Sequence, residues 1–366
     1  MIKELTFNNL NTIPVATMSK QKANDISLKG YVAPELRAFN NVKITSNADS
    51  KIIIEKIEKD MPILKNFEFG ISKESIEQGQ KEFNQGYLIT VPKKVKEDEQ
   101  IEIEFILDEE NLTLVDNIVI VAEEESAANI MIKYLSKDGS AGYHNGLLTV
   151  IAKEKAHVKV RKINLLNNET LNMDSTQSEV YYYGNVEYLL ADLGGKYSLT
   201  NYHGDLLEEN ANGELDSIYI GADKKIIDMN YVMTFRGRRC TGRMDIKGAL
   251  KDEANKIFKG TLDFKRGSSR SAGEEGEFCM ILSPTVKSKA VPLLLCGEDD
   301  VSGEHAAASG KIDEDKLFYL MTRGMSYNEA RRIVIEGEFN PIIDKIEKDD
   351  VKEEILRVIK ECLDNE

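Results

Sequence analysis

Alternating apolar and polar positions dominate the middle of the chain. From about Tyr87 onward, short runs rich in β-forming residues follow one another, punctuated by Gly, Asp and Asn. Two such runs place their apolar residues on a common face: Ile227, Met229, Tyr231, Met233 and Phe235 in one, and Phe258, Leu262 and Phe264 in the other. A period of two is typical of a strand with one buried side. The pattern therefore predicts strands through about Cys296.

No helix-length amphipathic segment separates these strands, which disfavours alternating strands and helices and leaves a sandwich, a barrel or a β-solenoid. A degenerate recurrence of strand, turn and strand, roughly every twenty-odd residues, fits stacked rungs. Its glycines are Gly221, Gly237, Gly248, Gly260 and Gly276. The recurrence favours the solenoid, while the pattern alone leaves the other two folds open.

The two ends of the chain differ from this middle part. Residues 1–86 mix polar loops with helix-like stretches such as 72–83, where Ser72 stands before the first turn. We therefore expect three parts: a mixed, partly helical region over 1–86, a strand core over 87–296 and a helical region over 297–366.

Three helices are expected in the last part. The first covers Asp313 to Arg323 and ends at Gly324, which suits the left-handed position of a helix end. The second begins at Ser326, whose spacing to Glu329 is that of a capping box, and is broken at Asn340-Pro341. The last runs from about Asp350 to Leu363 and carries Cys362 on its apolar stripe.

Charge and targeting signals narrow the possible partners. The chain has 48 Lys and Arg against 63 Asp and Glu, a formal net charge of −15, which repels phosphate backbones and anionic lipid. No run approaches the roughly 20 apolar residues of a membrane span, and the first residues lack the layout of a secretion signal. We expect a cytoplasmic protein that binds neither nucleic acid nor membrane.

Familiar catalytic motifs are missing from the sequence. It has no phosphate-binding loop, dinucleotide fingerprint, HExxH or GxSxG, and no spacing forces two carboxylates together. The four cysteines, Cys240, Cys279, Cys296 and Cys362, are widely spaced and form no CxxC pair, so each is first read as a small buried hydrophobe. The sequence thus predicts no enzyme.

One histidine stands apart from the other three. His144, His157 and His203 lie in β-rich or loop sequence, where structural or surface roles are expected. His305 lies in a polar stretch of small residues, 304–310, at the junction between the strands and the helices. Such a junction is a candidate contact surface, and an imidazole there is a candidate metal ligand.

The segment around His305 carries a family resemblance. Matching positions in order are Pro292, Asp300, Val301, His305, Gly310, Asp313 to Asp315, Leu317 to Leu320, Arg323, Gly324, Ala330 and Arg331. Residues 291–339 thereby resemble the carboxy-terminal signature of the SufB/SufD family, and 240–264 is similar to that family's strand series. The resemblance covers about residues 180–345.

This resemblance implies a right-handed parallel β-helix flanked by mainly helical terminal parts. It also implies a non-catalytic scaffold subunit of the SUF machinery for iron–sulfur cluster assembly. Such subunits pair through their β-helices with a SufB-type paralogue or with a second copy of themselves. Their carboxy-terminal helices dock a SufC-type ABC ATPase, and the partner hydrolyses the ATP.

The resemblance also implies a site. A transient iron–sulfur cluster forms between the two β-helices and uses the histidine that corresponds to His305, beside Glu304. The key SufB cysteine corresponds to Glu277, so this chain is more SufD-like. Cys279, two residues on, shares its face and is either a shifted thiolate or simply buried. The several histidines that many members carry in the strand over 226–239 are absent here.

The matches at Phe318, Tyr319, Arg323 and Gly324 imply a surface that docks the ATPase, although the two aromatic residues could equally pack the helical unit. Two alternative functions remain. Carbohydrate-active enzymes often use β-solenoids, but this chain lacks both a secretion signal and Trp. A plain interaction platform without a metal role is the other alternative.

Overall fold

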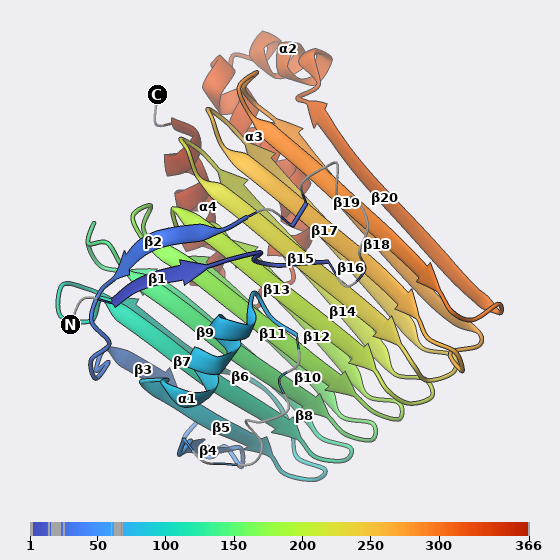
Figure 1. Ribbon diagram of the computed structural model, residues 1–366. Helices are drawn as coiled ribbons and strands as arrows, with labels where there is room; N and C mark the ends of the chain where they lie inside the picture. The colour runs from blue at the N-terminus through green and yellow to red at the C-terminus, as the bar shows by residue number, and fades with distance from the viewer. Residues whose placement is uncertain are drawn as a thin grey trace.

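The computed structural model describes residues 3–364, except 14, 16–22, 25, 60, 62–66 and 68. Two sheets of nine strands each face one another along the molecule (Figure 1). Sheet I contains β3 (Val42–Thr45), β6 (Lys96–Leu107), β8 (Ala127–Ser136), β10 (His157–Leu165), β12 (Asn185–Asp192), β14 (Asn212–Gly221), β16 (Thr241–Leu250), β18 (Ser271–Ile281) and β20 (Val301–Lys311). Sheet II contains β4 (Ile53–Lys56), β5 (Gln85–Val91), β7 (Thr113–Ala122), β9 (Tyr143–Ala152), β11 (Leu171–Val180), β13 (Tyr197–Leu206), β15 (Ile226–Phe235), β17 (Asn255–Phe264) and β19 (Lys287–Cys296).

From β5 to β20 the chain alternates between the two sheets, and each strand pairs in parallel with the strand two further on. Each rung of the coil therefore consists of one strand from each sheet. Asn185 and its partner Asn212 are 27 residues apart, and Asn212 and its partner Thr241 are 29 apart. This winding confirms the β-solenoid and rejects the sandwich and the barrel.

The space between the sheets is a long apolar core. Side chains of the two sheets meet there, including the stacked pair Phe235 and Phe264, with ring centroids 4.3 Å apart. Every residue of the predicted alternating set from Ile227 to Phe235 is fully buried in this core. The period of two therefore identified the buried face correctly.

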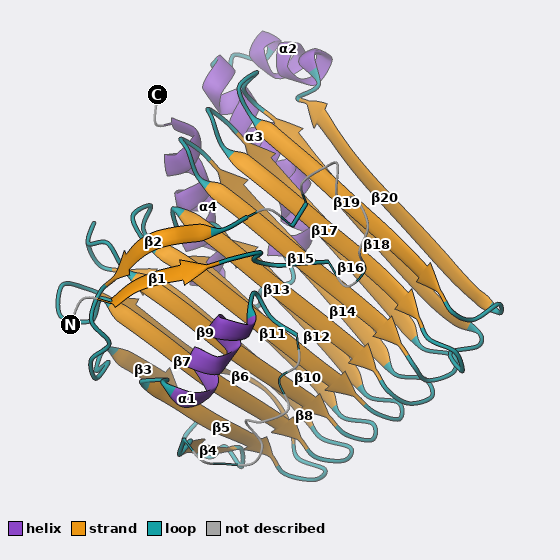
Figure 2. Ribbon diagram, in the orientation of Figure 1, coloured by secondary structure: helices purple, strands orange, loops and turns teal. Residues whose placement is uncertain are grey.

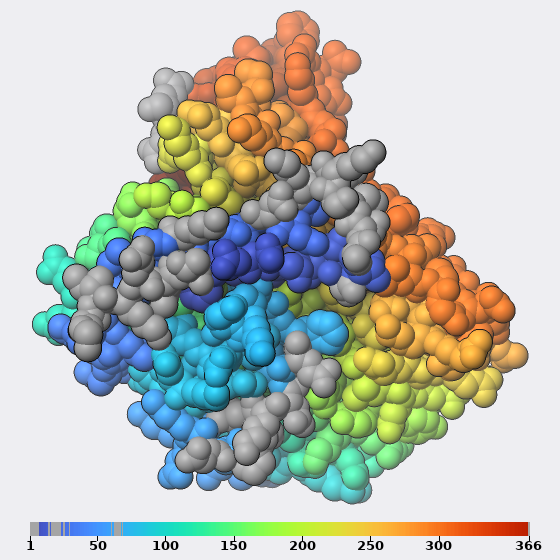
Figure 3. All heavy atoms as spheres, in the orientation of Figure 1, coloured from blue at the N-terminus to red at the C-terminus, as the bar shows by residue number. Residues whose placement is uncertain are grey.

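Sheet II is covered on its outer side by the first part of the chain. The hairpin of β1 (Lys3–Phe7) and β2 (Leu28–Ala33) crosses this face, and α1 (Lys73–Lys81) packs on β7 and β9 (Figures 1 and 3). A second apolar cluster joins Phe7 and Leu10 to Val119 and Leu199 of the sheet. Ser72 caps α1, as expected, by accepting a hydrogen bond from the backbone of Ser75.

Sheet I is covered by helices from the other end. The helices α3 (Tyr327–Ile343) and α4 (Asp349–Asp364) bury Ile335, Phe339 and Ile355 against it, and α2 (Glu314–Thr322) packs on α3 (Figure 2). The predicted capping box at Ser326 is present. None of the described helices is both long and apolar enough to cross a bilayer.

Two details differ from the expectation. Pro341 does not break its helix, because it lies in the last turn of α3, where a missing N–H removes only one bond near the end. The strands also continue beyond 296, since β20 occupies part of the segment expected to be helical. Small residues fill β20, and no further rung covers it, so its sequence lacks the apolar alternation of a buried strand.

Candidate functional site

The last strand leaves the solenoid open. β20 pairs only with β18, and its other edge has no strand partner in the described part of the chain. Most of its residues are exposed, including the run Ala306 to Ala308. An unpaired edge of this length can accept a strand from another chain.

The register between β18 and β20 decides which side chains share a face. Glu275 stands beside His305, Glu277 beside Ala307, and Cys279 beside Ser309. Neighbours in a parallel pair point to the same side of the sheet. Because Glu275, Glu277 and Cys279 are buried in the solenoid, His305 lies on the core-facing side of β20, where its side chain is exposed.

Glu304 belongs to the other face. It pairs with Glu274, and Glu274 pairs with Arg243, so all three lie on the outer side of sheet I. These residues line a shallow hollow of about 390 Å³, to which Glu275 and His305 also contribute. By the register, the side chains of Glu304 and His305 lie on opposite faces of β20.

Glu277 is held by strong partners inside the solenoid. The Tyr219 hydroxyl donates to its Oε1 at 2.6 Å, and the Lys256 ammonium donates to the same oxygen at 2.7 Å. All three side chains are buried. A carboxylate with a buried counter-ion and a phenol donor is a stable structural pair, so Glu277 is not free to bind a metal in this arrangement.

Cys279 is fully buried next to this pair. Burial raises the pKa of its thiol, which keeps the sulfur protonated near neutral pH. A buried thiol of this kind is a weak nucleophile and a poor ligand without a change in its surroundings. Cys279 is thus buried in the structure, and its role as a shifted thiolate ligand stays a prediction.

Glu275 is a residue that sequence reasoning missed. It is 3% exposed, and neither carboxyl oxygen has a hydrogen-bond partner in the described part of the chain. Burial, together with the nearby charge of Glu277, raises its pKa to about 8. Gly260 makes room for it across the core, because a Cβ there would come within 2.4 Å of the Glu275 Cδ. Its place two residues before Glu277, on the same face, was the available signal.

These residues do not form a closed metal site within one chain. Among the residues that the structure describes, no group of three or more His, Cys, Asp or Glu side chains is placed to hold a metal ion. The register brings Glu275 and His305 side by side at the open end.

The remaining histidines have structural settings. His144 is buried between Asp116 at 2.8 Å and Asn172 at 2.6 Å, and His157 pairs with Glu187 at 2.8 Å. Burial lowers the pKa of His203 to about 4, so its ring stays neutral near pH 7. These three are not placed beside the open end.

The predicted docking residues project from α2 and its end. Phe318 is 69% exposed and Tyr319 is 57% exposed, whereas their neighbour Leu317 is buried. The Arg323 guanidinium lies 5.2 Å from the centre of the Tyr319 ring, and Gly324 ends the helix with φ of +95°. The two aromatic side chains therefore do not pack this helical unit but present an apolar surface to solvent.

The fold and its exposed features define a class: a β-solenoid whose outer faces are covered, whose last strand is open, and whose terminal helix displays aromatic side chains. Comparison with known proteins specifies the class further. Residues 105–338 match the family model described as SUF system FeS cluster assembly, SufBD core domain. The chain belongs to this family.

Individual relatives agree with the family model. The chain is 25% identical over 279 residues to the "Iron-sulfur cluster assembly protein SufD" of Bacillus subtilis, covering 76% of this chain and 64% of that protein. It is 26% identical over 257 residues to an "Iron-sulfur cluster assembly SufBD family protein" of Staphylococcus saprophyticus, covering 70% of this chain and 55% of that protein. The chain thus spans less than two thirds of the length of these relatives.

Proposed function

We propose that the chain is a non-catalytic scaffold subunit for iron–sulfur cluster assembly in the cytoplasm. In this proposal, β20 pairs with the corresponding strand of a SufB-type paralogue or of a second copy of the chain. A nascent cluster, which is the cargo of the assembly, is held between the two solenoids with His305 as a ligand. The observation that carries the proposal is the outer edge of β20, which has no strand partner among the described residues, together with His305 on the core-facing side of this strand.

The chemistry of the open end supports such a transient site. Imidazole is an established substitute for thiolate on iron–sulfur clusters. Glu275 beside it has unsatisfied oxygens, so a second chain that brings thiolates or iron would meet groups lacking partners. Because Glu277 is engaged by Lys256 and Cys279 is buried, the thiolates in this proposal come from the partner.

A second contact supports the proposal. The exposed Phe318 and Tyr319, with Arg323 against the Tyr319 ring, form an apolar surface with a cationic margin on α2. We assign this surface to the SufC-type ABC ATPase, which supplies ATP hydrolysis that the chain itself lacks. With these two contacts, we propose that the chain is divided into an N-terminal part, a solenoid and a helical docking part.

The test is anaerobic co-purification of the full chain with a SufC-type ATPase and a SufB-type paralogue, followed by measurement of iron, acid-labile sulfide and visible absorption. His305→Ala should lower the cluster content strongly while leaving the complex intact. Glu304→Gln is the matched control, because its side chain lies on the opposite face and should leave the cluster content unchanged.

Three results would count against this function. Equal loss with Glu304→Gln and His305→Ala would show that the core-facing side is not what binds the cluster. A complex that forms normally and accepts a cluster equally well with His305→Ala would favour the plain interaction platform. Failure of the chain to associate with the ATPase would reject the scaffold assignment.

A further inference from the structure

A cavity lies at the corner of the solenoid where the turns after β10, β12 and β14 approach α4. Its volume is about 280 Å³. Polar and apolar surface line it about equally, and its apolar side chains are Leu165, Leu166, Leu193, Ile220, Ala222 and Val358. Cys362 of α4 also lines it, and the exposed Glu361 stands at its rim. This corner is formed by different strands from those that position His305.

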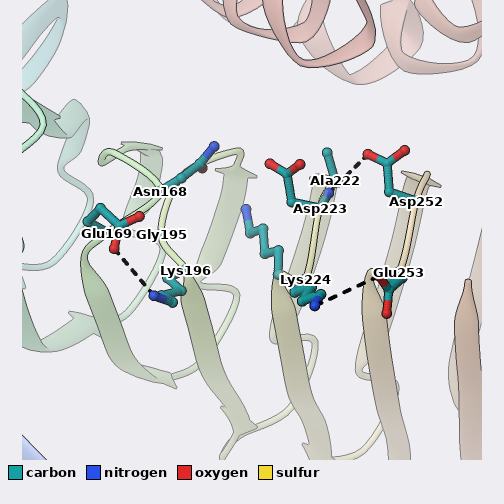
Figure 4. A pocket seen from close by; sticks show the side chains of 10 residues that line it. Asn168, Glu169, Gly195, Lys196, Ala222, Asp223, Lys224, Asp252 and Glu253 are labelled. Carbon is teal, nitrogen blue, oxygen red and sulfur yellow. Dashed lines mark hydrogen bonds and ion pairs between the residues drawn. The ribbon is translucent and has the colours of Figure 1, made fainter. Parts of the chain in front are cut away.

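A second hollow, of about 420 Å³, adjoins the cavity and opens along the ends of the strands (Figure 4). The two share Asn168, Ala222 and Lys225 as lining residues. Lys225 therefore lies where the cavity meets the outer hollow.

Lys225 is an unpaired buried cation. Its side chain is 6% exposed, and its Nζ makes no hydrogen bond within the described part of the chain. Burial lowers the pKa of the ammonium, and the charge of Asp192 compensates only in part. Asp192 directs Oδ1 to Asn164 and Ser198, and its Oδ2 is likewise unpartnered. A buried ammonium without a hydrogen-bonded partner is unfavourable, and a bound anion would relieve the cost.

The other lysines around the outer hollow are different. Lys196 pairs with Glu169 at 3.3 Å, and Lys224 lies 3.9 Å from Glu253, both at the surface (Figure 4). The ammonium groups of Lys196 and Lys224 are thus paired with carboxylates from neighbouring turns. Lys225 alone among these three side chains faces the cavity without a partner in the described residues.

We propose that this corner binds a small carboxylic acid with an apolar body, whose carboxylate pairs with the Nζ of Lys225 and whose hydrocarbon part lies against Leu165, Ile220 and Val358. The volume corresponds to about nine water molecules, which is enough space for a short-chain acid such as hexanoate. Inorganic phosphate fits less well, because it has no hydrocarbon part to contact the apolar side chains and its higher charge meets a single ammonium. The site is independent of cluster assembly.

Alkylation of the native cysteines provides a direct test. Cys362 lines the cavity, whereas the exposed Cys296 ends β19 and serves as an internal control. Iodoacetamide is applied to the full chain at mildly alkaline pH, since burial raises the pKa of the Cys362 thiol, and modification at each cysteine is followed by mass spectrometry. Hexanoate at ten times its dissociation constant should slow the reaction at Cys362 about tenfold and leave Cys296 unchanged.

Two probes and two variants decide what the site recognises. 1-Hexanol has the same apolar body without charge, and phosphate has charge without the body, so both should protect Cys362 far less than hexanoate. Lys225→Met should weaken hexanoate protection about tenfold or more, and Lys224→Met, next to it on the surface, should not.

The proposal fails if hexanoate gives the wild-type chain no protection, or if 1-hexanol or phosphate protects equally well. It also fails if Lys225→Met, checked for its native fold by circular dichroism, retains the full effect. Should that variant not fold, the comparison of the three probes on the wild-type chain still decides the outcome.

Discussion

The two ends of the solenoid expose their outermost strands in different ways. At the first end, β3 and β4 have four residues each, pair antiparallel and carry charges such as Lys43, Glu55 and Lys56. At the last end, β20 has 11 residues, follows the parallel register and is rich in Ala and Gly. Short, charged edges resist strand addition, whereas a long edge of small residues allows it. This difference is why we propose that the contact with another chain lies at the last end.

Removing a buried charge should show the largest difference between the two ends. Lys256→Met leaves Glu277 buried without its counter-ion near the last end and should lower the free energy of unfolding by about 3–5 kcal/mol. Lys43→Met breaks only the exposed pair with Glu104 near the first end and should cost less than about 1 kcal/mol. Urea unfolding followed by circular dichroism measures both. Equal losses of unfolding free energy in the two variants would contradict the difference between the two ends.

Blocking the long edge should weaken association next most strongly. Ala307→Pro in β20 removes a backbone donor and disturbs the strand, so binding to a SufB-type paralogue or self-association should fall about a hundredfold. Ile44→Pro in β3 is the counterpart at the first end and should leave the dissociation constant unchanged. Analytical ultracentrifugation of each variant provides the measurement. Loss of binding with Ile44→Pro alone would place the contact at the wrong end.

The aromatic surface of α2 should matter for the ATPase but not for strand pairing. Phe318→Ser removes a large exposed apolar side chain and should weaken ATPase binding about tenfold. Tyr182→Ser, at an exposed tyrosine on a solenoid turn, is the control. Isothermal titration calorimetry with the ATPase distinguishes them. An unchanged affinity with Phe318→Ser would remove α2 from the docking surface.

The last prediction concerns pH. Because the pKa of Glu275 rises from an ordinary 4.5 to about 8 on folding, the native state binds this proton more tightly than the unfolded chain does. Its contribution to stability is complete below about pH 4.5 and is lost as the pH rises toward 8. Glu275→Gln keeps a neutral side chain and should gain stability relative to the wild type as the pH rises from 5 to 8. Thermal unfolding at the two pH values tests this.

Much of the solenoid could be predicted from the sequence. Alternation identified the inward faces of β15 and β17, since an apolar residue at every second position has one physical explanation in a strand. Capping residues Ser72, Asp313 and Ser326 begin helices where the sequence placed them, because their side chains satisfy local backbone donors.

Other features depend on contacts that local sequence does not contain. β20 was assigned to the helical part because an exposed strand of small residues has no apolar period to detect. His305 was singled out by its setting between the strands and the helices, and the family resemblance made it the expected ligand, a role that stays a prediction. The separation of Glu304 from His305, the Lys256–Glu277 pair and the unpartnered Glu275 all follow from register across rungs, which only the folded chain shows.

That register turns the chain into a two-dimensional grid. One coordinate runs along a strand, and the other advances by a whole rung, so residues about thirty positions apart become immediate neighbours, as Arg239 and Glu209 do at 2.7 Å. Motif searches compare only residues that are consecutive in the sequence, so they miss neighbours that lie on adjacent rungs. In such a solenoid, a binding site can consist of one residue from each of several successive rungs. A search for a local sequence motif does not detect a site of this kind. Single-residue insertions would be tolerated in the turns, whereas one inside a strand would shift its whole row to the opposite face.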